Sequence, residues 1–141
     1  MSRAPRARDV AASTDVVARA FAVMEHAYAP YSRFRVGAVL VDESGALHQG
    51  CNVENASYGA AICAERGAVL RALADGVRRF TRIVIATEAP TPTPPCGMCR
   101  QVLVEFAPTL EVESHTRGGA VGRWRLDELL PHAFTPDALD R

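Results

Sequence analysis

The sequence predicts an α/β protein, a three-layer α-β-α sandwich around a mixed five-stranded sheet. Helix-like and strand-like segments follow one another in the order α-β-β-α-β-α-β-β-α, which is typical of helices packed on the faces of a sheet. Short apolar runs such as Ile83-Val84-Ile85-Ala86 indicate strands that are covered on both faces. The 141 residues suffice for one domain with a substantial core.

Two parts of the chain are expected: a flexible tail over residues 1–13 and a single domain over residues 14–141. The tail is rich in Arg, Ala and Pro and shows no periodic apolar pattern. No apolar stretch follows its arginines, so we expect no secretory signal and a cytoplasmic location. No apolar run approaches the roughly 18 residues that would span a bilayer, so we expect no membrane partner.

The domain is expected to begin with a helix over residues 14–28 and to continue with a hairpin. One face of that helix is apolar and carries Val17, Phe21, Met24 and Tyr28. The β-branched run at residues 36–41 and the segment 47–53 are expected to pair as antiparallel strands around a turn at 42–45.

The second half alternates helices and strands. The remaining expected elements are a helix over 63–74, a strand over 82–87, a loop with four prolines over 88–95, a helix over 96–106, strands over 110–113 and 121–126, and a helical turn and tail over 129–141. We expect the strand after each long helix to run parallel to an arm of the first hairpin.

Charge restricts the possible functions. Basic and acidic residues balance at 16 each, so no overall positive field would attract nucleic acid, and no nucleic-acid partner is expected. Every basic residue is Arg, which excludes a Schiff-base lysine and a P-loop lysine.

The segment Pro95-Cys96-Gly97-Met98-Cys99 is the first candidate site. Two cysteines three residues apart in the first turn of a helix point the same way and can share one ion. A thioredoxin-type redox pair also sits at a helix start, so this spacing alone leaves metal and redox chemistry equally open.

Cys63 favours metal over redox, because it also opens an expected helix that follows a strand. Two helix starts can meet at one end of an open α/β sheet, where such folds keep their sites. Cys63, Cys96 and Cys99 then supply three thiolates to one zinc ion per chain and leave a fourth position for water, as in catalytic zinc sites.

Two neighbours of Cys63 fit this chemistry. Glu65 lies two residues after Cys63 and could shuttle protons without binding the ion. Alternatively, Glu65 could be an ordinary glutamate in the first turn of the helix, where its negative charge interacts favourably with the helix dipole. Arg66 lies three residues on and could donate to the thiolates, or else be an ordinary surface cation. A purely structural four-thiolate site closed by Cys51 is the competing hypothesis, although we expect Cys51 to be a small buried strand residue.

Several motifs together resemble the small cytidine deaminases that act on free nucleosides. Cysteine or histidine, then Glu, then Pro-Cys-x-x-Cys is the known signature of zinc-dependent deaminases. The resemblance covers roughly residues 14–139. Its motifs are Tyr31-Ser32-Arg33-Phe34-Arg35-Val36-Gly37-Ala38, Gly50-Cys51-Asn52-Val53-Glu54-Asn55-Ala56-Ser57-Tyr58, Ile62-Cys63-Ala64-Glu65-Arg66, Pro95-Cys96-Gly97-Met98-Cys99-Arg100-Gln101-Val102 and Glu128-Leu129-Leu130-Pro131 with Phe134.

The resemblance implies hydrolysis of cytidine and 2′-deoxycytidine to the uridine forms and ammonia, in pyrimidine salvage, by a homotetramer. It assigns zinc to the three cysteines and proton transfer to Glu65. It assigns the ribose hydroxyls to Asn52 and Glu54, the pyrimidine carbonyl to the backbone around Ala64, the base to Phe34, and closure of the pocket, often of a neighbouring subunit, to Tyr58 and Phe134.

Plainer roles stay open for several of these residues. Phe34 could be ordinary core, Asn52 could satisfy loop backbone, and Tyr58 and Phe134 could serve packing alone. Arg35 departs from the family pattern, because it stands where Pro or another small residue is common; Gly67 and Pro94 depart as well.

Two other deaminase types compete with this interpretation. An enzyme for a modified nucleoside of the antibiotic type is disfavoured by Asn52-x-Glu54, which reads an unaltered ribose. A nucleic-acid-editing deaminase is disfavoured by the balanced charge and by Cys63 where His is more frequent.

Overall fold

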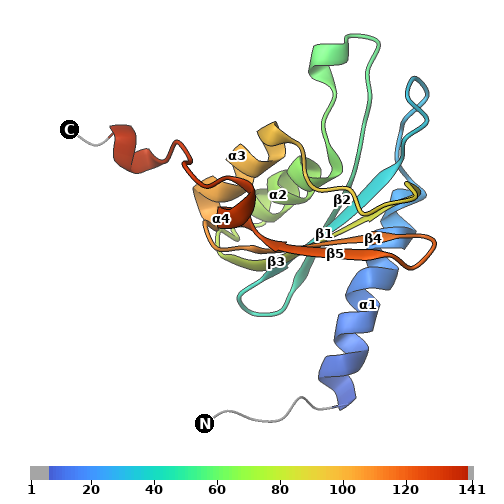
Figure 1. Ribbon diagram of the computed structural model, residues 1–141, viewed down its shortest axis with the longest axis horizontal. Helices are drawn as coiled ribbons and strands as arrows, with labels where there is room; N and C mark the ends of the chain where they lie inside the picture. The colour runs from blue at the N-terminus through green and yellow to red at the C-terminus, as the bar shows by residue number, and fades with distance from the viewer. Residues whose placement is uncertain (1–6, 140–141) are drawn as a thin grey trace.

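The computed structural model describes residues 7–139, which form three layers around one sheet (Figure 1). The sheet has five strands in the order β2-β1-β3-β4-β5. They are β1 (Val36–Asp42), β2 (Leu47–Cys51), β3 (Phe80–Thr87), β4 (Glu111–Thr116) and β5 (Val121–Arg125). The helices are α1 (Ala7–Met24), α2 (Ala64–Ala74), α3 (Gly97–Phe106) and the short α4 (Leu126–Leu129), with 3₁₀ turns η1 (Tyr58–Ala60) and η2 (Pro136–Leu139).

The strand directions confirm the mixed sheet. Strand β1 is antiparallel to both β2 and β3, β3 is parallel to β4, and β4 is antiparallel to β5. Because β2 and β3 both oppose β1, they run the same way, and β4 runs with them. The carboxyl ends of β2, β3 and β4 therefore lie at one edge of the sheet.

Alternate residues of the central strands face different helices, as the period of a strand requires. Ala38 and Ile85 belong to the larger core, which α2 and α3 cover, whereas Val39 and Val84 belong to the smaller core under α1. Figure 1 shows α1 on one side of the sheet and α2 and α3 on the other. The expected α-β-α layering is confirmed.

Two glycines allow the helices to approach the strands closely. A Cβ on Gly37 of β1 would lie 2.0 Å from the carbonyl oxygen of Ala20 in α1. A Cβ on Gly50 of β2 would lie 2.4 Å from the backbone nitrogen of Ala68 in α2. Both distances are far inside van der Waals contact, so only glycine permits this packing, and Gly50 in particular lets α2 lie against the hairpin.

Several boundaries differ from those expected: β2 ends at Cys51 rather than at residue 53, β3 begins at Phe80 rather than at 82, and α4 spans Leu126–Leu129 where a helical turn was expected to start at 129. The larger differences concern α1 and β4. Helix α1 begins at Ala7 rather than near residue 14, since Ala-rich sequence favours helix without an apolar face. It ends at Met24, because Tyr28 pairs with Val53 instead. Strand β4 extends past residue 113 to Thr116, and in this extension the buried hydroxyl groups of Ser114 and Thr116 accept backbone hydrogen bonds.

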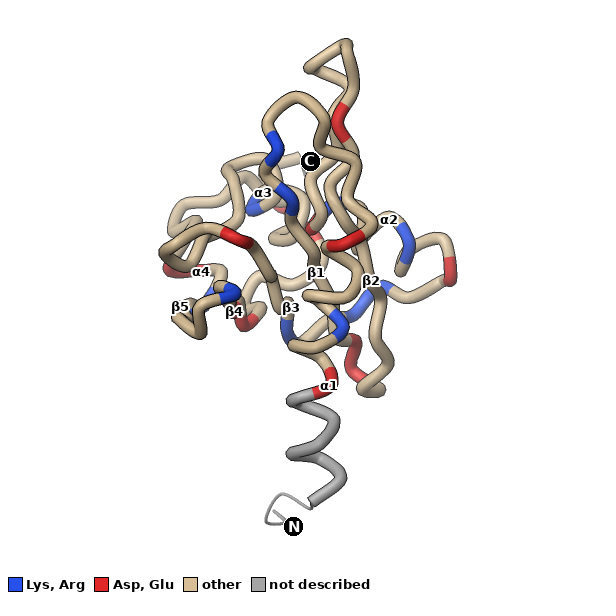
Figure 2. The backbone as a smooth tube through the Cα atoms, turned by 90° about the vertical axis from the view of Figure 1, so that its right-hand side faces the viewer, with Lys and Arg blue, Asp and Glu red and all other residues tan. Residues whose placement is uncertain are grey.

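The expected tail overlaps the start of α1, and its first six residues lie outside the described residues. The division into tail and domain therefore stays a prediction. Within residues 7–139, no helix has both the length and the apolar character to cross a membrane. Figure 2 shows basic and acidic positions interspersed over the described chain in that view, in keeping with the balanced total charge.

Candidate metal and substrate site

Two helix N-termini meet at the edge of the sheet where β2 and β3 end. Cys63 is the N-cap residue of α2 and Cys96 is the N-cap residue of α3, both with extended backbone. Because β2 and β3 run the same way, the loops that follow them start both helices at this edge. The free N–H groups and positive dipole ends of both helices favour negative charge here.

Three cysteine sulfurs gather at these helix starts. Cys63 Sγ lies 3.8 Å from Cys96 Sγ, and Cys96 Sγ lies 3.4 Å from Cys99 Sγ. In a tetrahedron with zinc–sulfur bonds of about 2.3 Å, neighbouring sulfurs are about 3.8 Å apart. The separations and the soft donor set therefore fit one zinc ion.

Cys51 is not a member of this group, which among the described residues contains Cys63, Cys96 and Cys99 alone. Cys51 is the last residue of β2 and is half-buried, and burial raises the pKa of its thiol. The geometry thus offers no support for a four-thiolate structural site.

Arg66 contacts the cysteine group from the first turn of α2. Its Nη2 donates to Cys63 Sγ at 3.6 Å and to the carbonyl oxygen of Ala61 at 3.4 Å. A hydrogen bond from Cys99 and the Arg66 contacts lower the pKa of Cys63 to about 5. The same bond to Cys63, together with burial, raises the pKa of Cys99. The arrangement thus favours an ionised thiol at Cys63 beside the positive charge of Arg66.

Glu65 is the buried carboxyl group of the site, with only 5% of its surface exposed. Burial raises the pKa of Glu65 to about 7, and the negative charge on Cys63 adds to the rise. A carboxyl group with such a pKa can both accept and release a proton near neutral pH.

A cavity of about 180 Å³ joins these groups to the residues assigned to the substrate. Its walls are formed by Phe34, Val36, Asn52, Cys63, Ala64, Glu65, Ile85, Thr93, Pro94 and Cys96. Six of the site residues expected from the sequence thus lie together around one hollow. Ala64 is fully buried at the first position of α2, where its backbone N–H has no partner within the helix.

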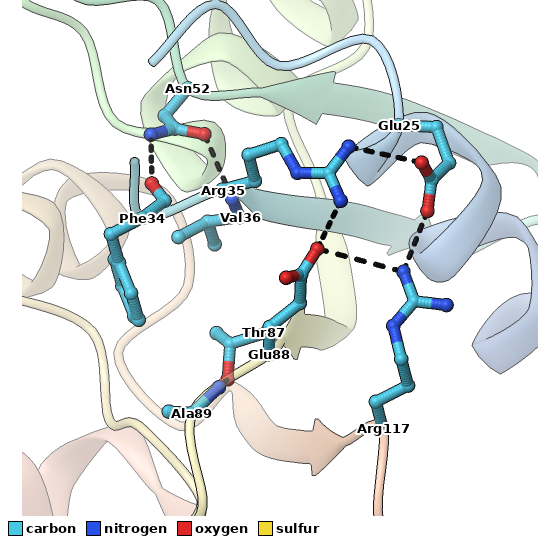
Figure 3. Close-up of polar contacts among 9 residues, drawn as sticks. All are labelled: Glu25, Phe34, Arg35, Val36, Asn52, Thr87, Glu88, Ala89 and Arg117. Atoms are coloured by element: carbon cyan, nitrogen blue, oxygen red, sulfur yellow. Dashed lines mark hydrogen bonds and ion pairs between the residues drawn. The ribbon is translucent and has the colours of Figure 1, made fainter. Parts of the chain in front are cut away.

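Asn52 ties the cavity wall together through its side chain. Its Oδ1 accepts a hydrogen bond from the backbone nitrogen of Val36 at 2.8 Å, and its Nδ2 donates to the carbonyl oxygen of Phe34 at 2.8 Å (Figure 3). The backbone role considered as the plainer alternative is therefore present, and Asn52 lines the cavity as well.

Glu54 lies beside a different hollow. Its Oε1 accepts from the backbone nitrogens of Tyr31 at 3.0 Å and Ser32 at 3.1 Å, and its Oε2 accepts from the Ser32 hydroxyl. The hydroxyl bond from Ser32 is the main cause of the lowered pKa of Glu54. Tyr58 lines the same hollow, is 76% exposed, and packs edge-on against Tyr31 with ring centroids 5.8 Å apart.

Phe134 also lies away from the cysteine cavity within one chain. It is 59% exposed, and its carbonyl oxygen accepts a hydrogen bond from Gln101 Nε2 at 2.8 Å. The structure therefore gathers the three expected zinc ligands, Glu65, Ala64, Phe34 and Asn52, but does not bring Glu54, Tyr58 or Phe134 into the same hollow.

Four wall residues were not expected from the sequence: Val36, Ile85, Thr93 and Pro94. Val36 begins β1 and Ile85 lies near the end of β3, at the sheet edge that carries the site. Strand alternation combined with the shared carboxyl-end edge could have identified Ile85. Thr93 and Pro94 lie in an irregular loop, where no periodicity shows which side chain turns inward.

Comparisons with known proteins agree with this geometry. Residues 11–112 match the family described as the cytidine and deoxycytidylate deaminase zinc-binding region. A cytidine deaminase of Halalkalibacterium halodurans is 40% identical over 89% of this chain and 96% of its own length. One of Mycobacterium tuberculosis is 41% identical over 82% of this chain and 84% of its own length.

Solved structures are similar in three dimensions as well. The crystal structure of cytidine deaminase from Burkholderia pseudomallei has a TM-score of 0.83 and 48% identity, covering 86% of this chain and 98% of that one. Cytidine deaminase from Mycobacterium leprae has a TM-score of 0.74 and 35% identity over 85% of this chain.

Proposed function

The chain belongs to the family of cytidine and deoxycytidylate deaminases with a zinc-binding region, and we propose that it hydrolyses cytidine and 2′-deoxycytidine to uridine and 2′-deoxyuridine with release of ammonia. The observation that carries this proposal is a buried glutamate beside three clustered cysteines in one cavity. A place in pyrimidine salvage is consistent with that reaction.

Cys63, Cys96 and Cys99 would hold the zinc ion, one per chain. Zinc held there would lower the pKa of water, so that hydroxide is available as the attacking nucleophile near neutral pH. Three thiolates weaken that effect by their negative charge, and Arg66 with the two helix N-termini offsets it.

Glu65 carries the protons in the proposed reaction. It takes a proton from the attacking water and gives it to the ring nitrogen next to the carbon that bears the amine. It then transfers the second proton to the departing amine, so that water is consumed and ammonia and the uridine form leave. The raised pKa of Glu65 suits a group that must take and give protons in turn.

The cavity walls orient the base. Phe34 would pack against the pyrimidine ring, and the backbone at Ala64 would donate to its carbonyl oxygen. Asn52 and Glu54 would hold the ribose hydroxyls. Both side chains already bond the backbone, but a carboxylate accepts up to about four hydrogen bonds and keeps capacity for a hydroxyl.

We further propose a cytoplasmic homotetramer in which Tyr58 and Phe134 close a neighbouring subunit's cavity. Both side chains are large, apolar and exposed, and neither lines the cavity of its own chain. Light scattering should give four times the 15.2 kDa chain mass. A single-chain mass would contradict the tetramer.

Ammonia release from a panel of nucleosides tests the proposed reaction. Cytidine and 2′-deoxycytidine should be deaminated efficiently, whereas cytosine should react poorly and adenosine should not react. Zinc-loaded protein that releases ammonia from adenosine but not from cytidine would overturn the assignment.

A further inference from the structure

A cluster of four charged residues lies just outside the cavity wall (Figure 3). Arg35 pairs with Glu25 at 3.0 Å and with Glu88, and Arg117 pairs with Glu25 at 2.6 Å and with Glu88 at 3.7 Å. We call these four residues the Arg35 cluster. Each guanidinium thus lies between the same two carboxylates, which closes the cluster into a ring of contacts.

The cluster joins four segments that are distant in the chain. Glu25 follows α1, Arg35 precedes β1, Glu88 follows β3 and Arg117 follows β4. The last paired residues of these strands are Val36 with Thr87 and Thr87 with Thr116. The Arg35 cluster therefore adds side-chain contacts between β1, β3 and β4 where these strands are last paired, beside the backbone hydrogen bond from the nitrogen of Arg117 to the carbonyl oxygen of Thr87.

Both ends of the Arg35–Glu88 pair lead directly to the cavity. Phe34 and Val36, the two neighbours of Arg35, line the cavity, and Figure 3 shows the Phe34 ring directed away from the Arg35 guanidinium. Glu88 begins the loop that carries the cavity-lining residues Thr93 and Pro94 and leads to Cys96. A change in the Arg35–Glu88 contact would therefore shift Phe34 and Val36 relative to the loop that carries Thr93 and Pro94.

The segment before Phe34 needs such support. Arg33 has a φ of 59°, in the left-handed region that non-glycine residues adopt at a cost. Asn52 holds Phe34 and Val36 from one side. Arg35 holds the same stretch from the other side, so Phe34 is fixed between two side-chain anchors.

We propose that Arg35 is a positioning residue: by bridging Glu25 and Glu88 it sets where Phe34 stands against the loop 88–96, and hence the fit of the base. Arg35 touches neither the cysteines nor the cavity interior, so it acts on binding rather than on proton transfer. This proposal rests on the proposed function only in taking the cavity as the site of the base.

The dependence of KM on salt concentration distinguishes a positioning role of Arg35 from a contribution to the stability of the fold alone. The four side chains are between 34% and 53% exposed, so dissolved salt screens their contacts. Cytidine is uncharged near neutral pH, which leaves no attraction between enzyme and substrate for salt to weaken. A KM that rises with ionic strength would therefore report the Arg35 cluster.

The test compares wild type, Arg35→Gln, Arg35→Lys and Arg19→Gln with cytidine at low and high salt. Arg19 forms an exposed ion pair with Asp15 on α1 and is the matched control. Exposed ion pairs are weak, so Arg35→Gln should raise KM about two- to fivefold at low salt, with kcat within twofold and zinc content unchanged. Arg35→Lys should lie between, because an ammonium group keeps the positive charge but lacks the planar fork of donors with which the guanidinium contacts Glu25 and Glu88.

High salt should raise the wild-type KM toward that of Arg35→Gln and change the Arg35→Gln value much less, because only the pairs of Arg117 remain there to be screened, while Arg19→Gln follows wild type. The dissociation constant for uridine, measured by calorimetry, should change with KM and gives a readout that needs no turnover. An unchanged KM in Arg35→Gln, or equal losses in kcat and binding, would overturn the proposal. Failure of the proposed function is seen separately, as absence of cytidine turnover in wild type.

Discussion

Glu65 shows how burial converts an ordinary carboxyl group into one suited to proton transfer. Only 5% of its surface is exposed, and the pKa rises to about 7 mainly because a buried charge loses its hydration. Its neighbour Cys63 is a proposed metal ligand, whereas Glu65 lies outside the ligand cluster, which among the described residues consists of Cys63, Cys96 and Cys99.

We therefore expect Glu65→Gln to keep the fold and the zinc and to lose turnover. Glutamine matches glutamate in size but carries no transferable carboxyl proton, and two transfers depend on it. General acid–base catalysis is typically worth about 10²- to 10⁴-fold, so the loss of kcat should reach the upper end of that range or exceed it. Steady-state kinetics with zinc analysis on the same sample measures both; turnover within tenfold of wild type would exclude Glu65 as the proton carrier.

Glu54 tests the assignment of the ribose. Charged hydrogen bonds are worth about 1.5 to 3 kcal/mol, so Glu54→Ala should lower kcat/KM for cytidine roughly ten- to two-hundred-fold. Cytosine lacks the ribose, so its already low rate should hardly change. The bonds from Tyr31 and Ser32 offer a different outcome: if Glu54 only supports that loop, both substrates lose in equal proportion and the ribose role is refuted.

At the scale of elements, the contact between β2 and α2 places Cys63 and Glu65. Gly50 makes this contact possible, since its missing side chain leaves room for the backbone of Ala64 and Ala68. Any larger residue must push α2 away from the hairpin. The start of α2 carries both a proposed zinc ligand, Cys63, and the proposed proton carrier, Glu65, so we expect a packing change here to affect metal binding and turnover.

Gly50→Ala should therefore lower both stability and zinc retention. Overpacking against backbone costs about 1–3 kcal/mol or more in the free energy of unfolding. Gly59→Ala is the matched control, because no atom lies within 4 Å of a Cβ at that position, and it should stay within about 0.5 kcal/mol of wild type. Denaturant unfolding with parallel metal analysis makes the comparison, and equal stability of the two variants would contradict the packing argument.

At the scale of the whole molecule, zinc should bind to the folded chain as one ion and stabilise it. The three sulfurs come from two helices that are far apart in the sequence, so the unfolded chain offers no formed site. A ligand that binds the folded state alone raises stability by mass action. The metal should thus connect α2 and α3 energetically as well as chemically.

Elemental analysis should give one zinc per chain in wild type and in Cys51→Ser, and almost none in the Cys96→Ala, Cys99→Ala double variant. Removal of the ion with a chelator should lower Tm in wild type and leave the double variant unchanged. Loss of zinc from Cys51→Ser would instead support a four-thiolate site.

The sequence by itself determined the layered fold and the chemistry of the metal site. Both follow from local signals: short continuous apolar runs predict strands covered on both faces, and cysteines at expected helix starts lie beside free backbone N–H groups that favour thiolates. Cys63, Glu65 and the Cys96–Cys99 pair could be named because residue type, spacing and helix position together specify a metal site.

Only the tertiary structure decided which distant segments share the cavity. Thr93 and Pro94 line it because the loop after β3 folds back, a path that no local pattern records. Phe34 and Asn52 meet there, whereas Glu54 faces another hollow, and the Arg35 cluster joins four segments that no spacing rule connects. The physical reason is that side chains in irregular loops take their direction from the partners that folding brings to them, and those partners lie far away in the sequence.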